Sequence, residues 1–440
     1  MRILFEDARI LAMNDKPIFR GDLVVDGNHI VYVGPNGSKH GPFERVIVCD
    51  GNVLMPGFKN AHTHSPMTFL RSYADDLPLN EWLYKAVFPL EALLEPGDEY
   101  ALAKVAFAEY LTSGITADFD MYYHPEEIAQ ASKDFGMRTV IVGTPVAGRE
   151  NVNKLKDNYL NLNHFDELVT FQLGFHAEYT ANDEMLKTLS KLANELHAPV
   201  FSHSSETMNE VNGCISRHGD TPTVYFDRLG LYNYGGGGYH CNFMSDKDLA
   251  IFKKRGLFAI TCPGSNTKLA SGVAPIQKMI DQGINLAIGT DGPASNNCLD
   301  FFREMFLVTG LQKLTNQDPR SCKAYNVLEM ATVGGAHAML LNDADTLEVG
   351  KLADIIEIDL HQPNMQPINN LENNIVYSGS KQNVKLTMIN GKILYEDNKF
   401  YLNEPIDEIY KKAQQVTDRI KAEVSDKNFK EDIQKWKTAK

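Results

Sequence analysis

The feature that most constrains the fold is a repeated alternation of short apolar runs with stretches of helical character. Eight such runs follow one another from about residue 53 onward, over roughly 280 residues. Parallel strands joined by crossover helices produce this alternation, and eight units of this length are typical of a (β/α)8 TIM-like barrel. We therefore predict an α/β fold whose barrel strands begin near Val53, Thr116, Arg138, Val169, Pro199, Gly237, Leu257 and Asn285.

The two ends of the chain have a different pattern. Residues 1–56 contain short strand-like runs broken by turn residues, and strand character returns after about residue 345 in the runs 350–358 and 384–389. Neither piece alone could bury both faces of a sheet, so we expect them to fold together. The predicted organisation is a composite β-sandwich domain (1–56 and 346–400), a barrel catalytic domain (57–345) and a C-terminal helical tail (401–440).

The tail carries apolar residues at helical spacing. This spacing favours a helix that docks on the rest of the molecule over an amphipathic helix that binds a partner. The apolar positions are Ile406, Ile409, Ala413, Val416, Ile420 and Val424.

Composition and charge exclude several classes of function. The 440 residues carry a formal net charge of -14 without a concentrated basic patch, so we expect no binding to nucleic acid. The six cysteines are far apart and contain no CxxC pair, which is typical of reduced thiols in a cytoplasmic protein. We find neither a secretory signal nor a membrane span, and we expect a small-molecule substrate. A homo-oligomer is left open.

Histidines and a carboxylate follow several of the predicted strands. His62 and His64 stand two residues apart at a strand end, so both side chains point the same way and can reach one metal ion. His203, His240 and Asp291 each come where a later predicted strand ends. All strand ends of a barrel open on one face, where these residues would meet. Imidazole and carboxylate ligands suit Zn²⁺ or a similar divalent ion, so we predict a metal site rather than a packed cluster without metal.

A glutamate stands close to one of these histidines. Glu206 lies three residues after His203, at the strand end and in the following loop. A metal lowers the pKa of a bound water, but a proton must still be taken up and delivered to the substrate. A carboxylate beside the metal can do both, so we predict that Glu206 is the proton carrier rather than a solvated loop residue.

Taken together, these motifs resemble the amidohydrolase superfamily, and within it the 5-methylthioadenosine/S-adenosylhomocysteine deaminases and their chlorohydrolase-like relatives. The likeness covers nearly the whole chain, and the joint occurrence of its motifs is more specific than any one of them. The motifs are Pro56-Gly57-Phe58-Lys59-Asn60-Ala61-His62-Thr63-His64, Tyr73-Ala74-Asp75-Asp76-Leu77-Pro78-Leu79, Ser202-His203-Ser204-Ser205-Glu206-Thr207, Gly289-Thr290-Asp291-Gly292-Pro293-Ala294-Ser295-Asn296-Asn297 and Gly350-Lys351-Leu352-Ala353-Asp354.

The resemblance implies a set of metal and catalytic residues. Members of this group bind one divalent ion, and we expect zinc; here the implied ligands are His62, His64, His203 and Asp291. The implied catalytic residues are Glu206, which also contacts the substrate, His240 and Asp291. Dinuclear members carry a lysine on the fourth strand, whereas the run from Val169 to His176 has none, so a single metal is expected.

The resemblance also implies substrate-binding residues. By motif, Glu91 would hold ribose hydroxyls, Arg149 the substrate tail and His176 the purine. The chain departs from its relatives at Glu178, where they often carry proline, and an added carboxylate there could alter which tail is accepted. A second departure is the glycine run before His240, which bears on the orientation of that histidine.

The expected activity is the hydrolytic deamination of an adenine nucleoside such as 5-methylthioadenosine or S-adenosylhomocysteine, with release of ammonia and an inosine-type product. Under this hypothesis, His240 and Asp291 orient the attacking water and Glu206 protonates the ring nitrogen. Two alternatives remain open. One is a deaminase of free bases (guanine, a pterin or cytosine) or a triazine hydrolase, because the same metal cradle attacks many electron-poor rings. The other is a catalytically silent homologue that serves in binding or assembly.

Overall fold

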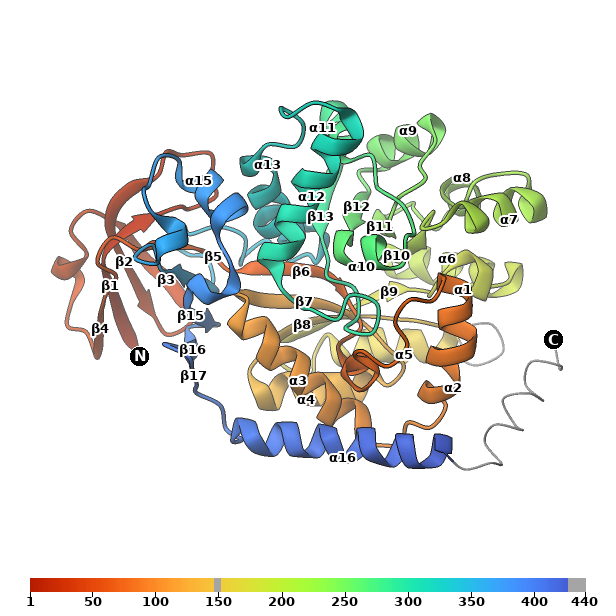
Figure 1. Ribbon diagram of the computed structural model, residues 1–440, viewed down its shortest axis with the longest axis horizontal. Coiled ribbons are helices and arrows are strands. Elements are labelled where there is room, and N and C mark those ends of the chain that lie inside the picture. Colours follow the sequence, from red (N-terminus) through yellow and green to blue (C-terminus); the bar gives the residue numbers. More distant parts are fainter. Residues whose placement is uncertain (146–151, 426–440) are drawn as a thin grey trace.

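The computed structural model describes residues 1–145 and 152–425 (Figure 1). Its centre is an eight-stranded parallel sheet in which each strand pairs with the next along the chain. This sheet curls into a nearly closed barrel, which confirms the predicted fold class. Its strands are β6 (Phe58–Thr63), β7 (Ile115–Met121), β8 (Arg138–Val142), β9 (Val169–Gly174), β10 (Val200–Ser204), β11 (Gly236–His240), β12 (Phe258–Thr261) and β13 (Asn285–Ile288).

Helices connect the strands and cover the outside of the barrel (Figure 1). The longer ones are α3 (Asp98–Thr112), α4 (Pro125–Phe135), α5 (Val152–Leu162), α6 (Asp183–Leu196), α7 (Met208–His218), α8 (Pro222–Arg228), α9 (Asp246–Arg255), α11 (Ile276–Gln282) and α12 (Phe301–Asn316). Shorter helical pieces lie in the connections, among them η2 (Ser65–Leu70), α1 (Leu79–Trp82), η3 (Leu83–Val87), α2 (Phe88–Glu91), η4 (Glu178–Thr180), α10 (Pro263–Lys268), α13 (Ala324–Glu329), η5 (Met330–Gly334) and α14 (Gly335–Ala338).

Side chains complete the contact between the first and last barrel strands. Asn60 Nδ2 donates to Thr290 Oγ1 at 2.8 Å, and Thr290 N donates to Asn60 Oδ1 at 2.8 Å. The backbone adds a bond of 3.0 Å from Asp291 N to His62 O. A Cβ on Gly289 would lie 2.8 Å from the His62 backbone, so only glycine allows this approach without a shift. The junction therefore brings His62 beside Asp291.

The glycine run before His240 forms strand β11. A Cβ on Gly236 would lie 1.9 Å from the carbonyl oxygen of Val200, and one on Gly237 would lie 2.4 Å from that of Phe258. Gly236 also has a φ of +125°, which side chains rarely tolerate. The run is thus poor in strand-forming residues because both neighbouring strands approach its backbone too closely for side chains. His240 consequently stands at the end of a barrel strand that pairs with β10 and β12, and its own φ is +69°.

The prediction of the first barrel strand was wrong in its position. The run near Val53 is strand β5 (Val53–Pro56), which pairs with strands of the other sheet, and the barrel begins at Phe58. Only Gly57 separates the two strands, so they look like one apolar run in the sequence. A Cβ on Gly57 would lie 2.1 Å from the Thr116 side chain, which explains the glycine at the crossing point.

Strands from both ends of the chain share one nine-stranded sheet, at the left of Figure 1. The two ends meet where β14 pairs antiparallel with β5. The predicted domain boundaries at 56/57 and 345/346 stay a prediction. The other strands of this sheet are β1 (Arg2–Ile10), β2 (Phe19–Asp26), β3 (His29–Gly34), β4 (Arg45–Val48), β14 (Ile355–Ile358), β15 (Val384–Ile389), β16 (Lys392–Glu396) and β17 (Lys399–Phe400).

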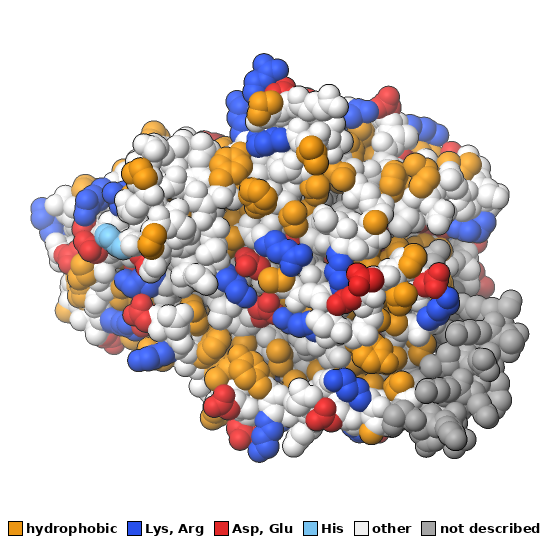
Figure 2. Space-filling view, viewed as in Figure 1, with side chains coloured by type: hydrophobic (Ala, Val, Ile, Leu, Met, Phe, Trp, Pro, Cys, Tyr) orange, Lys and Arg blue, Asp and Glu red, His pale blue; other side chains and the backbone are white. Residues whose placement is uncertain are grey.

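The tail forms helix α16 (Ile406–Ser425), which packs against α3 at the lower edge of Figure 1. Its Ile409, Ala413 and Ile420 are buried, and Arg419 donates to Asp98 on α3. This packing agrees with the docking interpretation. None of the described helices combines the length and the apolar character that a membrane crossing requires. On the face drawn in Figure 2, basic and acidic side chains are interspersed with apolar ones.

A buried ion pair ties the sheet to the barrel. Arg138, at the start of β8, donates to Asp354 through Nε (2.7 Å) and Nη2 (2.9 Å), and Asn390 N donates to the same carboxylate at 2.8 Å. The side chains of Arg138 and Asp354 are only 4% and 0% exposed. Burial alone would raise the pKa of Asp354, but the guanidinium outweighs burial and holds this pKa below its usual value. The aspartate of the Gly350–Asp354 motif is therefore structural.

We expect Asp354→Ala to lower the free energy of unfolding by about 3–5 kcal/mol, because it leaves the Arg138 charge buried and unpaired. Urea unfolding followed by circular dichroism measures this loss. The matched control is Glu408→Ala, which removes an exposed partner of Lys411 and should change stability by less than about 0.5 kcal/mol. Equal losses in the two variants would contradict the structural role of the buried pair.

Candidate active site

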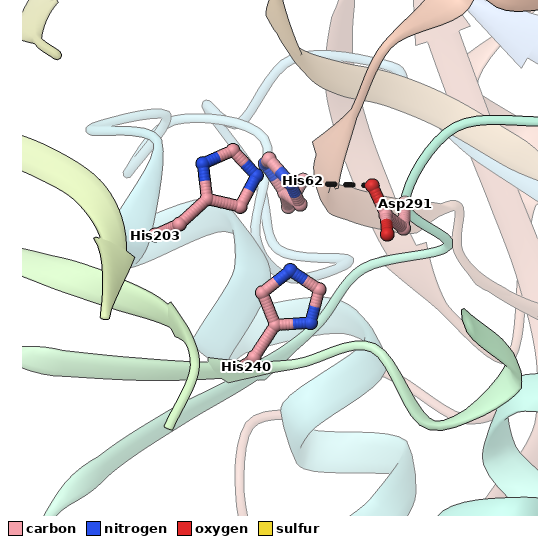
Figure 3. Close-up of side chains that lie close together, drawn as sticks. All are labelled: His62, His203, His240 and Asp291. Carbon is pink, nitrogen blue, oxygen red and sulfur yellow. Dashed lines mark ion pairs between the residues drawn. The ribbon is translucent and has the colours of Figure 1, made fainter. Parts of the chain in front are cut away.

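Four buried side chains converge at the carboxyl ends of the barrel strands (Figure 3). They are His62 on β6, His203 on β10, His240 at the end of β11 and Asp291 after β13. One potential ligand atom from each lies within 4.8 Å of all the others. This spacing suits coordination of a single metal ion, and three histidines with one carboxylate are a donor set that zinc and similar divalent ions prefer.

Hydrogen bonds on the far sides of the rings orient two of these histidines. His203 Nδ1 lies 2.7 Å from the carbonyl oxygen of His176, and His240 Nδ1 lies 2.8 Å from Asn266 Oδ1. Both partners are acceptors, so the Nδ1 atoms carry the protons and each Nε2 keeps its lone pair. Metal-binding histidines are commonly held in this way.

The ring of His62 supports the metal interpretation further. It is completely buried, and among the described residues neither of its nitrogens has a hydrogen-bond partner. Its Nε2 lies 3.5 Å from Asp291 Oδ1. Burial lowers the pKa of His62 to about 3, so the ring is neutral at physiological pH. A buried imidazole without partners is costly unless its lone pair binds something, and a metal ion fits that need.

Asp291 is held as an anion. Ser265 Oγ and Ser295 Oγ donate to its Oδ2 at 2.6 and 2.9 Å, and Gly292 N donates to Oδ1 at 2.8 Å. Burial alone would raise the pKa of Asp291, but the neighbouring histidines outweigh it and hold this pKa well below its usual value. The carboxylate is therefore ionised across the physiological range.

The predicted ligand His64 lies beside this cluster rather than within it. Its Nδ1 is 2.6 Å from the carbonyl oxygen of Met121, and its Nε2 is 3.3 Å from Asp291 Oδ1. The cluster thus contains three of the four ligands expected from the sequence, with His240 as its fourth member. Both His64 and His240 present an Nε2 atom to the same region, the first 3.3 Å from Asp291 Oδ1 and the second 3.9 Å from Glu206 Oε2.

Glu206 lies next to the cluster, in the loop after β10. Its Oε2 is 3.9 Å from His240 Nε2, and Ser271 Oγ donates to its Oε1 at 2.9 Å. Glu210 accepts the backbone N–H of Glu206 at 2.8 Å, and Asn242 donates to its carbonyl oxygen at 3.0 Å. Burial raises the pKa of Glu206, which brings it closer to the neutral pH at which an acid-base catalyst works best.

Three members of the metal cluster, His203, His240 and Asp291, line one cavity whose other lining residues are mostly apolar and aromatic. His176 lines it, with its Nδ1 3.1 Å from Thr180 Oγ1, and burial lowers the pKa of this ring to about 3. Glu91 also lines this cavity. The remaining lining residues include Met67, Leu79, Trp82, Leu83, Val87, Phe88, Met121, Tyr122, Tyr123, Thr144, Tyr179 and Leu269.

The expected influence of Glu178 on the substrate tail is not supported by its position. Its buried carboxylate accepts hydrogen bonds from Arg217, through Nε at 2.9 Å and through Nη2, and lies 3.1 Å from His218 Nε2. Glu178 is not among the residues that line the cavity, and its contacts with Arg217 and His218 tie the segment after β9 to α7. Arg149, the predicted partner of the substrate tail, lies outside the described residues.

Sequence reasoning missed several polar residues around the site. Asn266 orients His240 and donates to Asn242 Oδ1 at 2.9 Å, while Tyr122 and Tyr123 bond Glu91. A usable signal was present, because the two tyrosines follow β7 directly and Asn266 comes five residues after β12 ends at Thr261. Polar residues just past a barrel strand belong to the catalytic face.

We expect the purified chain to retain a divalent ion after dialysis against metal-free buffer. His62→Ala should lower metal affinity by at least ~10-fold, because it removes a cluster member that has no other partner. Elemental analysis after equilibration with zinc measures the bound metal. His361→Ala, which changes an exposed histidine near Asp50, is the matched control and should retain the wild-type amount. Undiminished zinc in the His62 variant would contradict the site.

Comparison with known proteins agrees with this fold and identifies the family. Residues 53–394 match the amidohydrolase family. A 5-methylthioadenosine/S-adenosylhomocysteine deaminase from Caldanaerobacter subterraneus subsp. tengcongensis is 35% identical over 437 residues, which cover 97% of this chain and 100% of that relative. One of the same name from Thermococcus kodakarensis is 37% identical, with 90% and 94% covered. The chain belongs to the amidohydrolase family.

Solved structures give the same picture. An adenosine deaminase from Xanthomonas campestris with bound zinc has a TM-score of 0.90 at 30% identity, with 96% of this chain and 98% of that chain covered. A guanine deaminase from C. acetobutylicum has a TM-score of 0.78 at 19% identity, with 90% and 100% covered. The atrazine chlorohydrolase of Arthrobacter aurescens TC1 has a TM-score of 0.86 at 19% identity, with 94% and 100% covered. The last two are similar in fold alone.

Proposed function

We propose that this chain hydrolytically deaminates adenine nucleosides such as 5-methylthioadenosine or S-adenosylhomocysteine. The observation that carries the proposal is the buried His-His-His-Asp cluster with Glu206 beside it, at a cavity that is also lined by Glu91 and His176. Relatives that bear this name cover nearly the whole chain at 35–37% identity and support the choice of substrate.

One divalent ion, which we expect to be zinc, would be held by His62, His64, His203 and Asp291. When bound, it supplies Lewis-acid activation of water, whose pKa falls from ~15.7 towards ~7. His240 is assigned to the attacking water rather than to the ion because its Nε2 faces the Glu206 carboxylate at 3.9 Å. Asp291, held as an anion, accepts a hydrogen bond from the same water.

Glu206 carries the proton in this scheme. It takes a proton from the attacking water and delivers it to the ring nitrogen beside the amine-bearing carbon. The second proton of the water, now on the hydroxyl group of the tetrahedral adduct, passes through Glu206 to the exocyclic amine, which leaves as ammonia as the C–N bond breaks and an oxo group remains on the ring. The buried carboxylate suits both steps because its raised pKa makes the protonated form accessible near neutral pH. His176 would contact the purine, and Glu91 would accept hydrogen bonds from the ribose hydroxyls.

We expect Glu206→Gln to lower kcat by about 10²- to 10⁴-fold, because the amide cannot shuttle a proton, while zinc content stays at the wild-type level. Ammonia release from 5-methylthioadenosine, with the accompanying ultraviolet shift, measures turnover. Glu184→Gln makes the same chemical change on the exposed face of α6 and should leave turnover intact. Wild-type turnover by the Glu206 variant would remove that residue from the mechanism.

The competing function is a deaminase of free bases or a triazine hydrolase, and Glu91 separates it from a nucleoside deaminase. Glu91→Ala should raise the KM for 5-methylthioadenosine by at least ~10-fold, because hydrogen bonds to a charged group are lost. A panel of guanine, cytosine, a pterin and atrazine is assayed in parallel. Activity confined to these compounds, unaffected by the Glu91 change, would keep the metal chemistry and overturn the nucleoside.

A further inference from the structure

Two tyrosines hold the carboxylate of Glu91 inside the cavity. Tyr122 OH donates to Glu91 Oε1 at 2.8 Å, and Tyr123 OH donates to Glu91 Oε2 at 2.9 Å. Glu91 ends α2, whereas the tyrosines follow β7, so the contact joins two segments about thirty residues apart. All three side chains line the cavity that contains the metal cluster.

Glu91, Tyr122 and Tyr123 together offer a ligand hydrogen-bond acceptors but no donor. A phenol has one proton to donate, and both phenols give it to Glu91, so each phenolic oxygen can only accept further hydrogen bonds. Each Glu91 oxygen keeps at least one lone pair after accepting from its tyrosine. Burial and the Glu91 charge raise the pKa of Tyr122 well above its usual value, which keeps this phenol protonated. The three side chains therefore present acceptors and no remaining donor.

The group is also held in place before any ligand binds. The residue after the tyrosine pair, His124, donates its backbone N–H to Glu99 Oε2 at 3.0 Å, and its Nδ1 lies 2.6 Å from Glu99 Oε1. Glu99 is 1% exposed on helix α3, so it forms a rigid anchor for the loop after β7. Pre-organised polar groups discriminate strongly, because a ligand that lacks the matching partner leaves them unpaired.

We propose that Tyr122 and Tyr123 are specificity-determining residues that fix the Glu91 carboxylate and make this corner of the cavity accept only a hydrogen-bond donor pair, such as the vicinal diol of a ribonucleoside. The inference rests on the proposed function, and it adds a chemical rule to it. A 2′- or 3′-deoxy sugar lacks a donor that the group requires. A phosphate at the same position can only accept, and its charge is repelled by Glu91.

The test compares the wild-type chain with Tyr122→Phe, Tyr123→Phe and the double variant, on 5-methylthioadenosine and its 2′,3′-dideoxy analogue. In the double variant we expect the KM for the diol substrate to rise at least ~10-fold, since the carboxylate loses both donors. The KM for the dideoxy analogue should change less than ~2-fold, because it never used the group. A parallel rise for both substrates, or no rise for either, would overturn the proposal.

Two controls make the outcome specific. Tyr225→Phe removes another tyrosine hydroxyl that donates to a carboxylate, Asp183 Oδ1 at 2.6 Å, outside the cavity, and should leave both KM values unchanged. Zinc content and the thermal midpoint of each variant show that metal site and fold are intact.

A measurement on the wild-type chain covers the case in which a variant does not fold. The 3′-phosphate of 5-methylthioadenosine should compete at least ~100-fold more weakly than the parent nucleoside, because it brings acceptors and charge to an acceptor group. Equal competition would overturn the proposal. If the wild-type chain deaminates no adenine nucleoside, the proposed function fails; if it deaminates diol and deoxy nucleosides equally well, the diol rule alone fails.

Discussion

Closure of the barrel between β6 and β13 is the constraint on which the site depends. The two strands meet through the paired side chains of Asn60 and Thr290 and through the bond from Asp291 N to His62 O. A parallel barrel directs every strand end to one face, so closure sets the histidines of β6, β10 and β11 around one point. His62 and Asp291 are more than two hundred residues apart in the sequence, and barrel closure brings their side chains together.

The site contains several buried titratable groups close together, and their environments shift their pKa values in different directions. Burial makes His62 and His203 neutral, whereas hydrogen-bond donors and neighbouring imidazoles keep Asp291 ionised. Burial acts in the opposite sense on Glu206 and raises its pKa. Groups with such divided roles are what a hydrolytic centre requires: neutral imidazoles and one anion for a metal ion, and a carboxyl group that can exchange a proton.

Two buried glutamates, Glu91 and Glu178, differ in their hydrogen-bond partners and therefore in their roles. Glu91 accepts hydrogen bonds from two phenols and lines the cavity, so its carboxylate can still accept from a ligand. Glu178, only two residues after a cavity residue, is engaged by Arg217 and His218 and ties a loop to α7. Their hydrogen-bond partners, and not their residue type, decide which of these two carboxylates lines the cavity.

The sequence by itself determined the fold class, the family and most of the histidines and carboxylates at the barrel mouth. Strand periodicity and strand-end motifs are local patterns, so they can be recognised in the sequence alone. It also marked His62, His203, Asp291 and Glu206 as neighbours. Tertiary structure alone decided that β5 belongs to the other sheet and that His240 joins the buried cluster. It also decided that Glu178 pairs with Arg217, while Tyr122 and Tyr123 line the cavity. These outcomes depend on side-chain direction and on partners far away in the chain, and neither has a local sequence pattern.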